Sequence, residues 1–269
     1  MRVDFKWCGV YNKNMITLSK RMEAIASMIT PGGVLADVGT DHGYIPIYQV
    51  QLHRNPYAVA MDLRKGPLER AAEHIRQSGL TGQIKTRLSD GVAALEPGEA
   101  DSIVVAGMGG ELILHILSEG EAVCRQAKEL ILQPQSEIAA VRRYLREHGY
   151  YVDAENMVFE DGKYYPMMRA QKRQAKTEEV MKCDGPEEEL QLEQELRYGP
   201  QLLWNKHPLL EGYLEREETL YRNVLDSLSG KNTEGAAARR AEVEHELFLI
   251  DKVRRNLSKP SVLYHSHLA

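Results

Sequence analysis

The chain has 269 residues, of which 43% are hydrophobic and 27% are charged, so it can bury one sizeable core and carry a smaller appendage. It contains no run of about 18 apolar residues and begins with no apolar secretory signal, so we expect neither a membrane span nor export. The three cysteines, Cys8, Cys124 and Cys183, lie far apart and predict neither a zinc site nor a disulfide. These features favour a cytoplasmic protein without a bound metal.

The net charge of −5 does not favour a polyanionic partner for the chain as a whole. The charge is unevenly distributed, however. Residues 1–30 carry five basic side chains against two acidic ones, which is a local net charge of +3. Composition therefore allows a nucleic-acid partner without requiring one.

Short apolar runs alternate with amphipathic stretches from about residue 34 to residue 170. The apolar runs predict buried strands at Val34–Val38, Tyr57–Asp62, Ile84–Leu88, Ile103–Ala106 and Leu130–Leu132. The amphipathic stretches predict helices over residues 44–53, 67–78, 110–127 and 137–148. Strands and helices that alternate at this spacing predict a parallel sheet with helices on both faces.

Two further strand-like runs follow, Tyr150–Phe159 and Lys163–Ala170, separated by Glu160-Asp161-Gly162. An Asp-Gly pair between such runs indicates a hairpin. Among doubly wound sheets, five parallel strands followed by an antiparallel pair favour methyltransferases over dehydrogenases, by analogy at the level of the fold.

The sequence becomes charged and helical after residue 170. Apolar residues recur at intervals of three and four in two stretches, namely Leu210, Leu214, Tyr221, Val224 and Leu228, and then Val243, Leu247, Ile250, Val253 and Leu257. The short polar loop Ser229–Gly235 between them predicts an antiparallel helical hairpin. Such a hairpin either packs as a small domain or serves as an arm for RNA or a protein partner.

The first strand leads into Gly39-Thr40-Asp41-His42-Gly43. Glycine at this place permits the close backbone approach that a cofactor with an amino-acid tail needs. A nicotinamide-binding loop would instead read G-x-G-x-x-G, so that a helix N-terminus receives a pyrophosphate. Asp41 stands where the second glycine of a D-x-G-x-G-x-G pattern would be, and its carboxylate would repel pyrophosphate but attract an ammonium group. Taken alone, the loop also fits a structural turn without a ligand.

Polar or glycine-rich segments also follow the next three strands. Asp62 ends the second strand, where a carboxylate can accept both ribose hydroxyls of an adenosine. Ser89-Asp90-Gly91 follows the third strand, where an aspartate can accept an adenine amino group. Gly107-Met108-Gly109-Gly110 follows the fourth and opens the edge at which ligands of α/β sheets bind. Each segment alone fits an ordinary turn or cap, but together they predict an adenosine-containing cofactor.

Four segments resemble the bacterial tRNA (adenine(22)-N(1))-methyltransferases, namely Leu18-Ser19-Lys20-Arg21, Ala36–Tyr44, Ser89-Asp90-Gly91 and Gly107-Met108-Gly109-Gly110. The resemblance covers about residues 15–170 well and extends, less distinctively, into a tail that includes Arg197-Tyr198-Gly199-Pro200. Residues 1–14 match nothing in that family, and whether they are ordered stays open.

The resemblance implies a class I methyltransferase fold, α/β and Rossmann-like, with a seven-stranded sheet. It implies an S-adenosylmethionine-binding catalytic domain over residues 15–170 and a helical, coiled-coil-like domain over residues 171–269 that helps to hold tRNA. Methylation of N1 of adenine 22 is implied by the resemblance alone.

Candidate site residues follow from these expectations. Asp41 is the candidate catalytic carboxylate, either orienting the adenine amino group or holding the methionine ammonium. The target base has to leave the folded tRNA, and Tyr44 is the candidate platform on which it stacks, with Lys20 and Arg21 as candidate phosphate contacts. The candidate cofactor residues are Gly39, Thr40, Asp41, His42, Gly43, Asp62, Ser89, Asp90, Gly91, Gly107 and Met108.

Other functions stay open at this point. A methyltransferase of a protein or small molecule would share the cofactor residues, whereas a non-catalytic RNA-binding module would not bind the cofactor. A nicotinamide-dependent dehydrogenase is disfavoured by the missing G-x-G-x-x-G motif. We expect a monomer that acts on tRNA and contacts neither a membrane nor a metal.

Overall fold

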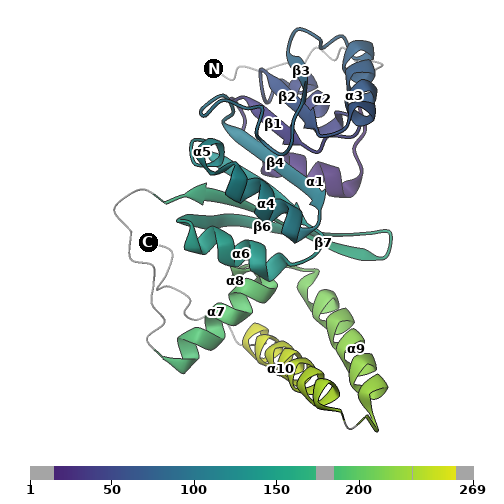
Figure 1. Cartoon of the computed structure of the whole chain (residues 1–269), viewed down its shortest axis with the longest axis vertical. Coiled ribbons are helices and arrows are strands. Elements are labelled where there is room, and N and C mark those ends of the chain that lie inside the picture. The colour runs from purple at the N-terminus through teal and green to yellow at the C-terminus, as the bar shows by residue number, and fades with distance from the viewer. Residues whose placement is uncertain (1–14, 174–184, 232, 259–269) are drawn as a thin grey trace, which may run out of the picture.

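The computed structural model describes residues 15–173, 185–231 and 233–258, so residues 1–14 lie outside the described residues. In this part of the chain, seven strands form one sheet in the order β3-β2-β1-β4-β5-β7-β6. They are β1 (Leu35–Val38), β2 (Ala58–Asp62), β3 (Ile84–Leu88), β4 (Ser102–Met108), β5 (Glu129–Pro134), β6 (Tyr150–Glu160) and β7 (Lys163–Lys172). The first five strands are parallel, and β7 lies antiparallel between β5 and β6 (Figure 1). The predicted seven-stranded Rossmann-like fold is confirmed.

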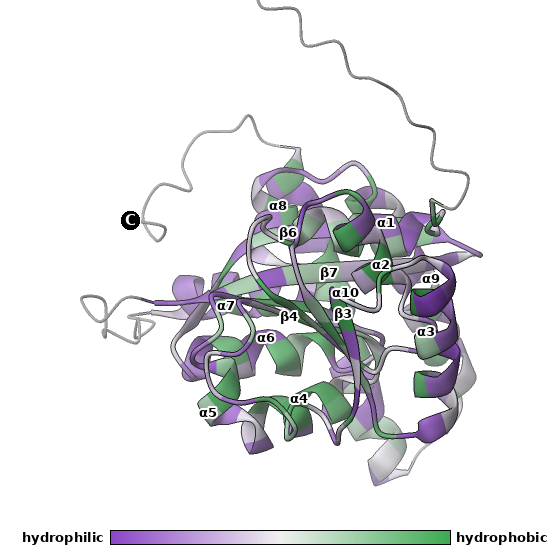
Figure 2. Ribbon diagram, turned by 90° about the horizontal axis from the view of Figure 1, so that it is seen from above, coloured by the Kyte–Doolittle hydropathy of each residue, from purple (hydrophilic) through white to green (hydrophobic). Residues whose placement is uncertain are grey.

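Helices cover both faces of the sheet, as the view from above shows (Figure 2). On one face the helices are α1 (Lys20–Met28), α2 (Tyr44–Gln51) and α3 (Lys65–Gln77), whose buried side chains share one core. On the other face they are α4 (Gly110–Glu119), α5 (Glu121–Cys124) and α6 (Ile138–Glu147). The central strands are therefore buried from both sides, which is why they read as continuous apolar runs in the sequence.

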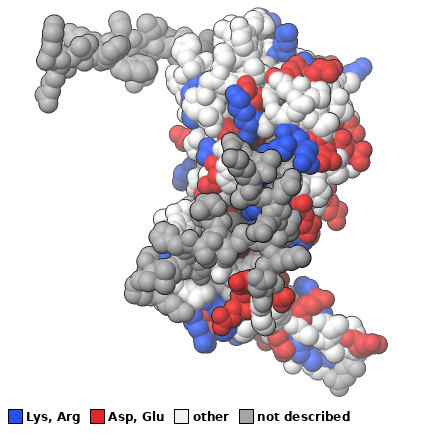
Figure 3. Space-filling view, turned by 90° about the vertical axis from the view of Figure 1, so that its left-hand side faces the viewer, with Lys and Arg blue, Asp and Glu red and all other residues white. Residues whose placement is uncertain are grey.

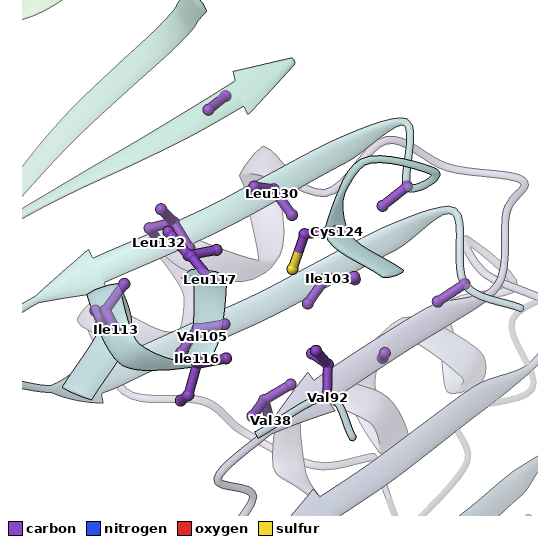
Figure 4. Packing of buried hydrophobic residues seen from close by; sticks show 14 of the residues in the cluster. Val38, Val92, Ile103, Val105, Ile113, Ile116, Leu117, Cys124, Leu130 and Leu132 are labelled. Atoms are coloured by element: carbon purple, nitrogen blue, oxygen red, sulfur yellow. The ribbon is translucent and has the colours of Figure 1, made fainter. Parts of the chain in front are cut away.

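The core on the α4–α6 side contains the cysteine at the end of α5. Figure 4 shows Cys124 among Ile103, Leu117 and Leu130, with its sulfur directed into the cluster. Burial raises the pKa of the Cys124 thiol to about 12, so the group stays protonated at neutral pH. It packs as a small apolar side chain and is structural.

Several of the predicted elements have different bounds in the structure. The helix expected over residues 110–127 is divided into α4 and α5 at Gly120, whose φ of −94° and ψ of 19° interrupt the helix. Only glycine fits at this position, because a Cβ there would lie 2.1 Å from Cγ2 of Val92. The strand expected to end at Ala106 continues as β4 to Met108. Met108 is therefore the last residue of the strand, and only Gly109 separates it from α4.

The β6–β7 hairpin turns at Asp161 and Gly162, which have φ values of 49° and 72°. Two left-handed residues in succession are typical of a type I′ turn, whose twist matches that of the flanking strands. Glu160 pairs with Lys163, so the loop has two residues rather than the three that we expected.

Four more helices follow the sheet, namely α7 (Pro186–Tyr198), α8 (Pro200–Trp204), α9 (Leu210–Leu228) and α10 (Glu234–Leu257). Arg254, late in α10, forms an ion pair with Glu211, early in α9, at 2.8 Å. The two helices are therefore antiparallel, as predicted (Figure 1). Their shared core includes Leu249, whereas Leu247, which we expected on the apolar stripe, is only partly buried. The coiled-coil form stays a prediction, as does the domain division at residue 170, since β7 runs to Lys172.

A buried ion pair joins these helices to the sheet. Arg142 on α6 donates to Glu155 on β6 at 2.8 Å, and their side chains are only 3% and 0% exposed. Arg142 also donates to the carbonyl oxygens of Leu196 and Arg197, at the end of α7. The second carboxylate oxygen of Glu155 accepts the backbone N–H of Gln201 in α8 at 2.9 Å. The pair thus satisfies backbone groups at the junction of α7 and α8 and fixes that junction on the sheet.

Removal of one partner would leave the other charge buried. We expect Arg142→Ala to lower the free energy of unfolding by about 3–5 kcal/mol. Arg125→Ala, which removes an exposed pair with Glu121, should cost less than about 1 kcal/mol. Urea denaturation of both variants checks this, and equal small losses would show that the buried pair does not hold the junction.

Candidate functional site

The candidate site lies at the carboxyl edge of the sheet, between β1 and β4. The chain passes from β1 outward to β2 and β3 and then returns to β4 on the other side of β1. The loops after β1 and β4 therefore diverge, and a crevice opens at this switch point. The Met108 side chain, at the end of β4, reaches the loop after β1, since a Cβ at Gly39 would lie 2.0 Å from its Cε. The structure thus brings together two segments that the sequence predicted separately.

The loop after β1 is fixed by backbone hydrogen bonds. The N–H groups of Gly39 and Thr40 both donate to the carbonyl oxygen of Met61 at 2.8 Å. The N–H of Gly43 donates to the Thr40 hydroxyl at 3.2 Å, and Gly43, with φ of 69°, leads into α2. Gly39 also has a positive φ of 77°. Both glycines therefore adopt a conformation that L side chains rarely adopt.

A buried carboxylate lies just before this loop. Asp37, in β1, is 7% exposed, and burial raises its pKa to about 6, although a hydrogen bond from Thr40 opposes that shift. Our sequence analysis did not select Asp37 as a site residue. The available signal was its place as the first acidic residue of the D-x-G-x-D-x-G pattern. A buried carboxylate with so high a pKa would gain from a cationic partner.

Asp41 is directed toward α3. Its side chain is 57% exposed, accepts a hydrogen bond from Nε of Arg70 at 3.2 Å, and lies 3.2 Å from Nε2 of His42. The Arg70 hydrogen bond lowers the pKa of Asp41 below its usual value. Asp41 is therefore an ionised carboxylate with a cationic partner, and its catalytic role stays a prediction.

Three rings gather beside Asp41. His42, Tyr44 and His74 are mutually stacked, with centroids 5.0 to 5.3 Å apart. A ring nitrogen of His74 lies 3.0 Å from the His42 carbonyl oxygen. Tyr44, the predicted stacking platform, thus already stacks with two neighbouring rings.

The ends of β2 and β3 supply the other predicted cofactor residues. Asp62 is 8% exposed, and one carboxylate oxygen accepts the Arg64 N–H at 2.7 Å. The hydroxyl of Ser89 donates to the Gly91 carbonyl oxygen and accepts the N–H of Ala94, so it holds its own turn together. The neighbouring Asp90 is exposed at the same edge.

The end of β4 meets the first turn of α1. A Cβ at Gly107 would lie 3.8 Å from Nε2 of Gln135 and 3.9 Å from Nη1 of Arg21. The Arg21 guanidinium lies over the Tyr165 ring, 5.0 Å from its centroid. Lys20 is exposed beside it. The predicted substrate residues Lys20 and Arg21 therefore lie at the same edge as the cofactor loops. Tyr165, Gln135, Arg70 and His74 were missed because only the fold places them there.

The opposite edge of the sheet has different features. A cavity of about 480 Å³ lies there, lined by residues that precede β1, β2 and β3, including Gly32, Asn55 and Gln83.

The face seen in Figure 3 shows basic and acidic side chains interspersed over its visible residues. In the described part of the chain, no three His, Cys, Asp or Glu side chains are placed to hold a metal ion. Within those same residues, no helix is long and apolar enough to cross a membrane.

Comparison with known proteins identifies the family. Residues 18–168 match the methyltransferase domain family. The tRNA (adenine(22)-N(1))-methyltransferase of Bacillus subtilis (strain 168) is 39% identical over 158 residues, which are 59% of this chain and 66% of that protein, slightly less than two thirds of its length.

Solved structures agree over more of the chain. The crystal structure of the B. subtilis M1A22 tRNA methyltransferase TrmK has a TM-score of 0.76 at 30% identity, covering 88% of this chain and 98% of that one. TrmK of M. capricolum, in complex with S-adenosylhomocysteine, has a TM-score of 0.73 at 27% identity, covering 89% and 99%. The resemblance found in the sequence is thereby confirmed: the chain has a methyltransferase domain and belongs to the TrmK family of tRNA (adenine(22)-N(1))-methyltransferases.

Proposed function

We propose that this protein transfers a methyl group from S-adenosylmethionine to N1 of adenine 22 in tRNA. One observation supports this most directly. The loop after β1 meets the end of β4 at the switch point of the sheet, beside the buried carboxylate Asp37, in a chain of the TrmK family. We also propose that it acts in the cytoplasm and as a monomer.

The residues at the switch point fit this cofactor. Gly39 and Gly43 adopt positive φ values that shape the turn of the β1 loop past which a methionine tail would lie. Asp37 would face the ammonium of that tail, and the carboxylate oxygen of Asp62 that does not bind Arg64 would accept the ribose hydroxyls. Asp90 would accept the adenine amino group. When bound, S-adenosylmethionine supplies an electrophilic methyl group on a sulfonium.

Little acid–base chemistry is required of the protein. Adenine N1 already carries a lone pair, so no side chain has to remove a proton before attack. The contribution of the protein is to align the base and exclude water, which together supply several kcal/mol. The methylated adenine is cationic, and a carboxylate or carbonyl oxygen nearby would stabilise the developing charge. Asp41 stays our candidate for that group, held in place by Arg70 and His42.

The direct test is transfer of label. Wild-type protein is incubated with methyl-labelled S-adenosylmethionine and with unmodified tRNA that carries adenine or guanine at position 22, and the digested nucleosides are identified. We expect N1-methyladenosine from the adenine transcript alone and a loss of label with Asp41→Ala. Label in a protein or small molecule, or none in tRNA despite measured cofactor binding, would contradict the proposal.

Gly39 tests the close approach at the loop. We expect Gly39→Ala to weaken S-adenosylmethionine binding by at least tenfold, because the new Cβ meets Met108 as well as adopting an unfavourable φ. Gly79→Ala is the matched control, since Gly79 has a similar φ of 70° but nothing within 4 Å of its Cβ position. Calorimetric titration measures both, and equal affinities would rule out a tight approach at Gly39.

The raised pKa of Asp37 predicts that the stability of the unliganded protein depends on pH. Its folded-state pKa of about 6 lies above the ordinary value of 3.8, so the unliganded protein loses stability as pH rises through this window. We expect Asp37→Asn to lack this loss and, at pH 7.5, to be more stable than wild type by about 3 kcal/mol.

The cofactor should reverse the effect. Wild-type affinity for S-adenosylmethionine should rise between pH 5 and pH 7 as Asp37 ionises, whereas the affinity of Asp37→Asn should be lower and unchanged. Chemical denaturation and cofactor titration at the two pH values measure this. Equal stability of wild type and Asp37→Asn, together with equal affinity for S-adenosylmethionine, would show that Asp37 is not part of the cofactor site.

A further inference from the structure

The first turn of α1 meets the β6–β7 hairpin at the carboxyl edge. The end of α1 lies at the amino edge, where the Thr30 N–H and hydroxyl donate to Glu129, the first residue of β5. Its beginning, at Lys20 and Arg21, therefore lies at the carboxyl edge. In the hairpin, β7 is antiparallel to β5, and the turn between β6 and β7 projects past the end of β5 (Figure 1). Arg21 and Tyr165 meet where these two elements converge.

The tyrosines of the hairpin divide between its two sides. Tyr164 contacts the ring of Tyr213 on α9, with centroids 5.5 Å apart, and helps to dock the helical part of the chain. Tyr165 is its neighbour in the strand and points to the opposite face. Met167 and Arg169, which share that face, contact the α1 side of the sheet. Tyr165 is thus turned toward α1 and the loop after β4, away from α9.

Arg21 has few partners of its own. Its Nε is buried without a hydrogen-bond partner, and no carboxylate in the described part of the chain lies within ion-pair distance. Its contact is the face of the Tyr165 ring, and its Nη1 is directed toward Gly107. A partly buried guanidinium without an anion is costly, which favours a ligand at this place.

The chemistry of the pair fits a nucleobase. A guanidinium plane and a phenol ring both stack on bases that are turned out of an RNA fold. Gln135 borders the same place, 3.8 Å from the Cβ position of Gly107. The place adjoins Met108, which contacts the cofactor loop at Gly39. Tyr44 is a poorer platform because it already stacks with His42 and His74.

We propose that Arg21 and Tyr165 form the stacking subsite that holds the target adenine next to Gly107, at the end of β4. This inference rests on the proposed function and goes beyond it, because it assigns the base to α1 and the β6–β7 hairpin. It also replaces the expected phosphate contact of Arg21 with a contact to the base.

Four variants test the subsite: Tyr165→Ala, Tyr165→Phe, Arg21→Ala and Arg21→Lys. Methylation of tRNA is measured at saturating S-adenosylmethionine, with cofactor affinity and melting temperature measured for each variant. We expect Tyr165→Ala and Arg21→Ala to lower kcat/KM for tRNA by at least about tenfold while cofactor affinity stays within twofold. Tyr165→Phe should keep most activity, because the ring face is retained. Tyr57→Ala, an exposed tyrosine at the opposite edge, is the matched control and should match wild type.

Arg21→Lys distinguishes stacking of the guanidinium plane on a base from a charge contact to a phosphate. Lysine keeps the charge but has no plane, so we expect it to be as impaired as alanine and the salt dependence of tRNA binding to stay as in wild type. Full activity of Arg21→Lys, with a reduced salt slope for Arg21→Ala, would instead identify a phosphate contact and overturn the inference. Full activity of Tyr165→Ala would overturn it as well. A wild-type protein that does not methylate tRNA would contradict the proposed function itself, which is a distinguishable result.

Discussion

The reversal of strand order between β1 and β4 is the constraint on which the site depends. In a parallel sheet every strand delivers its carboxyl end to the same edge, and only at a reversal do adjacent loops turn away from each other. Here the crevice lies between the loop after β1 and the end of β4, where the Met108 side chain approaches Gly39 and where Asp37 is buried in β1. The ends of β2 and β3 add Asp62 and Asp90 to the same edge. The proposed adenosine-binding features are thus a consequence of topology applied to a few polar residues at strand ends.

The remaining elements are arranged around this edge. The antiparallel hairpin extends beyond β5, where Tyr165 faces α1, and Arg216 of α9 donates to the carbonyl oxygen of Gly162 at its tip. The buried Arg142–Glu155 pair fixes the junction of α7 and α8 on the other side of the same strands. The helical part of the chain is therefore attached both at the hairpin tip and through β6.

Much of this could be predicted from the sequence. Apolar runs located five strands, the Asp-Gly pair located the hairpin, and Asp62 was correctly placed at the end of β2, because these features are local. The break at Gly120 was missed, although a glycine inside a predicted helix is a local signal for such a break. The pairing of Asp41 with Arg70 and of Arg21 with Tyr165 could not be foreseen either, since both join elements that only the fold brings together. Asp37 was within reach, but its burial and its raised pKa needed the structure.

The most direct measurement is a crystal structure of the protein with S-adenosylhomocysteine. Our account predicts that the ligand lies across the ends of β1 and β4, with its ribose hydroxyls on Asp62 and its ammonium facing Asp37. It also predicts that the place between Gly107 and the Arg21–Tyr165 pair stays open for the base. A ligand at the amino edge, in the cavity beside Asn55, or an adenosine seated on Tyr165 itself, would contradict it.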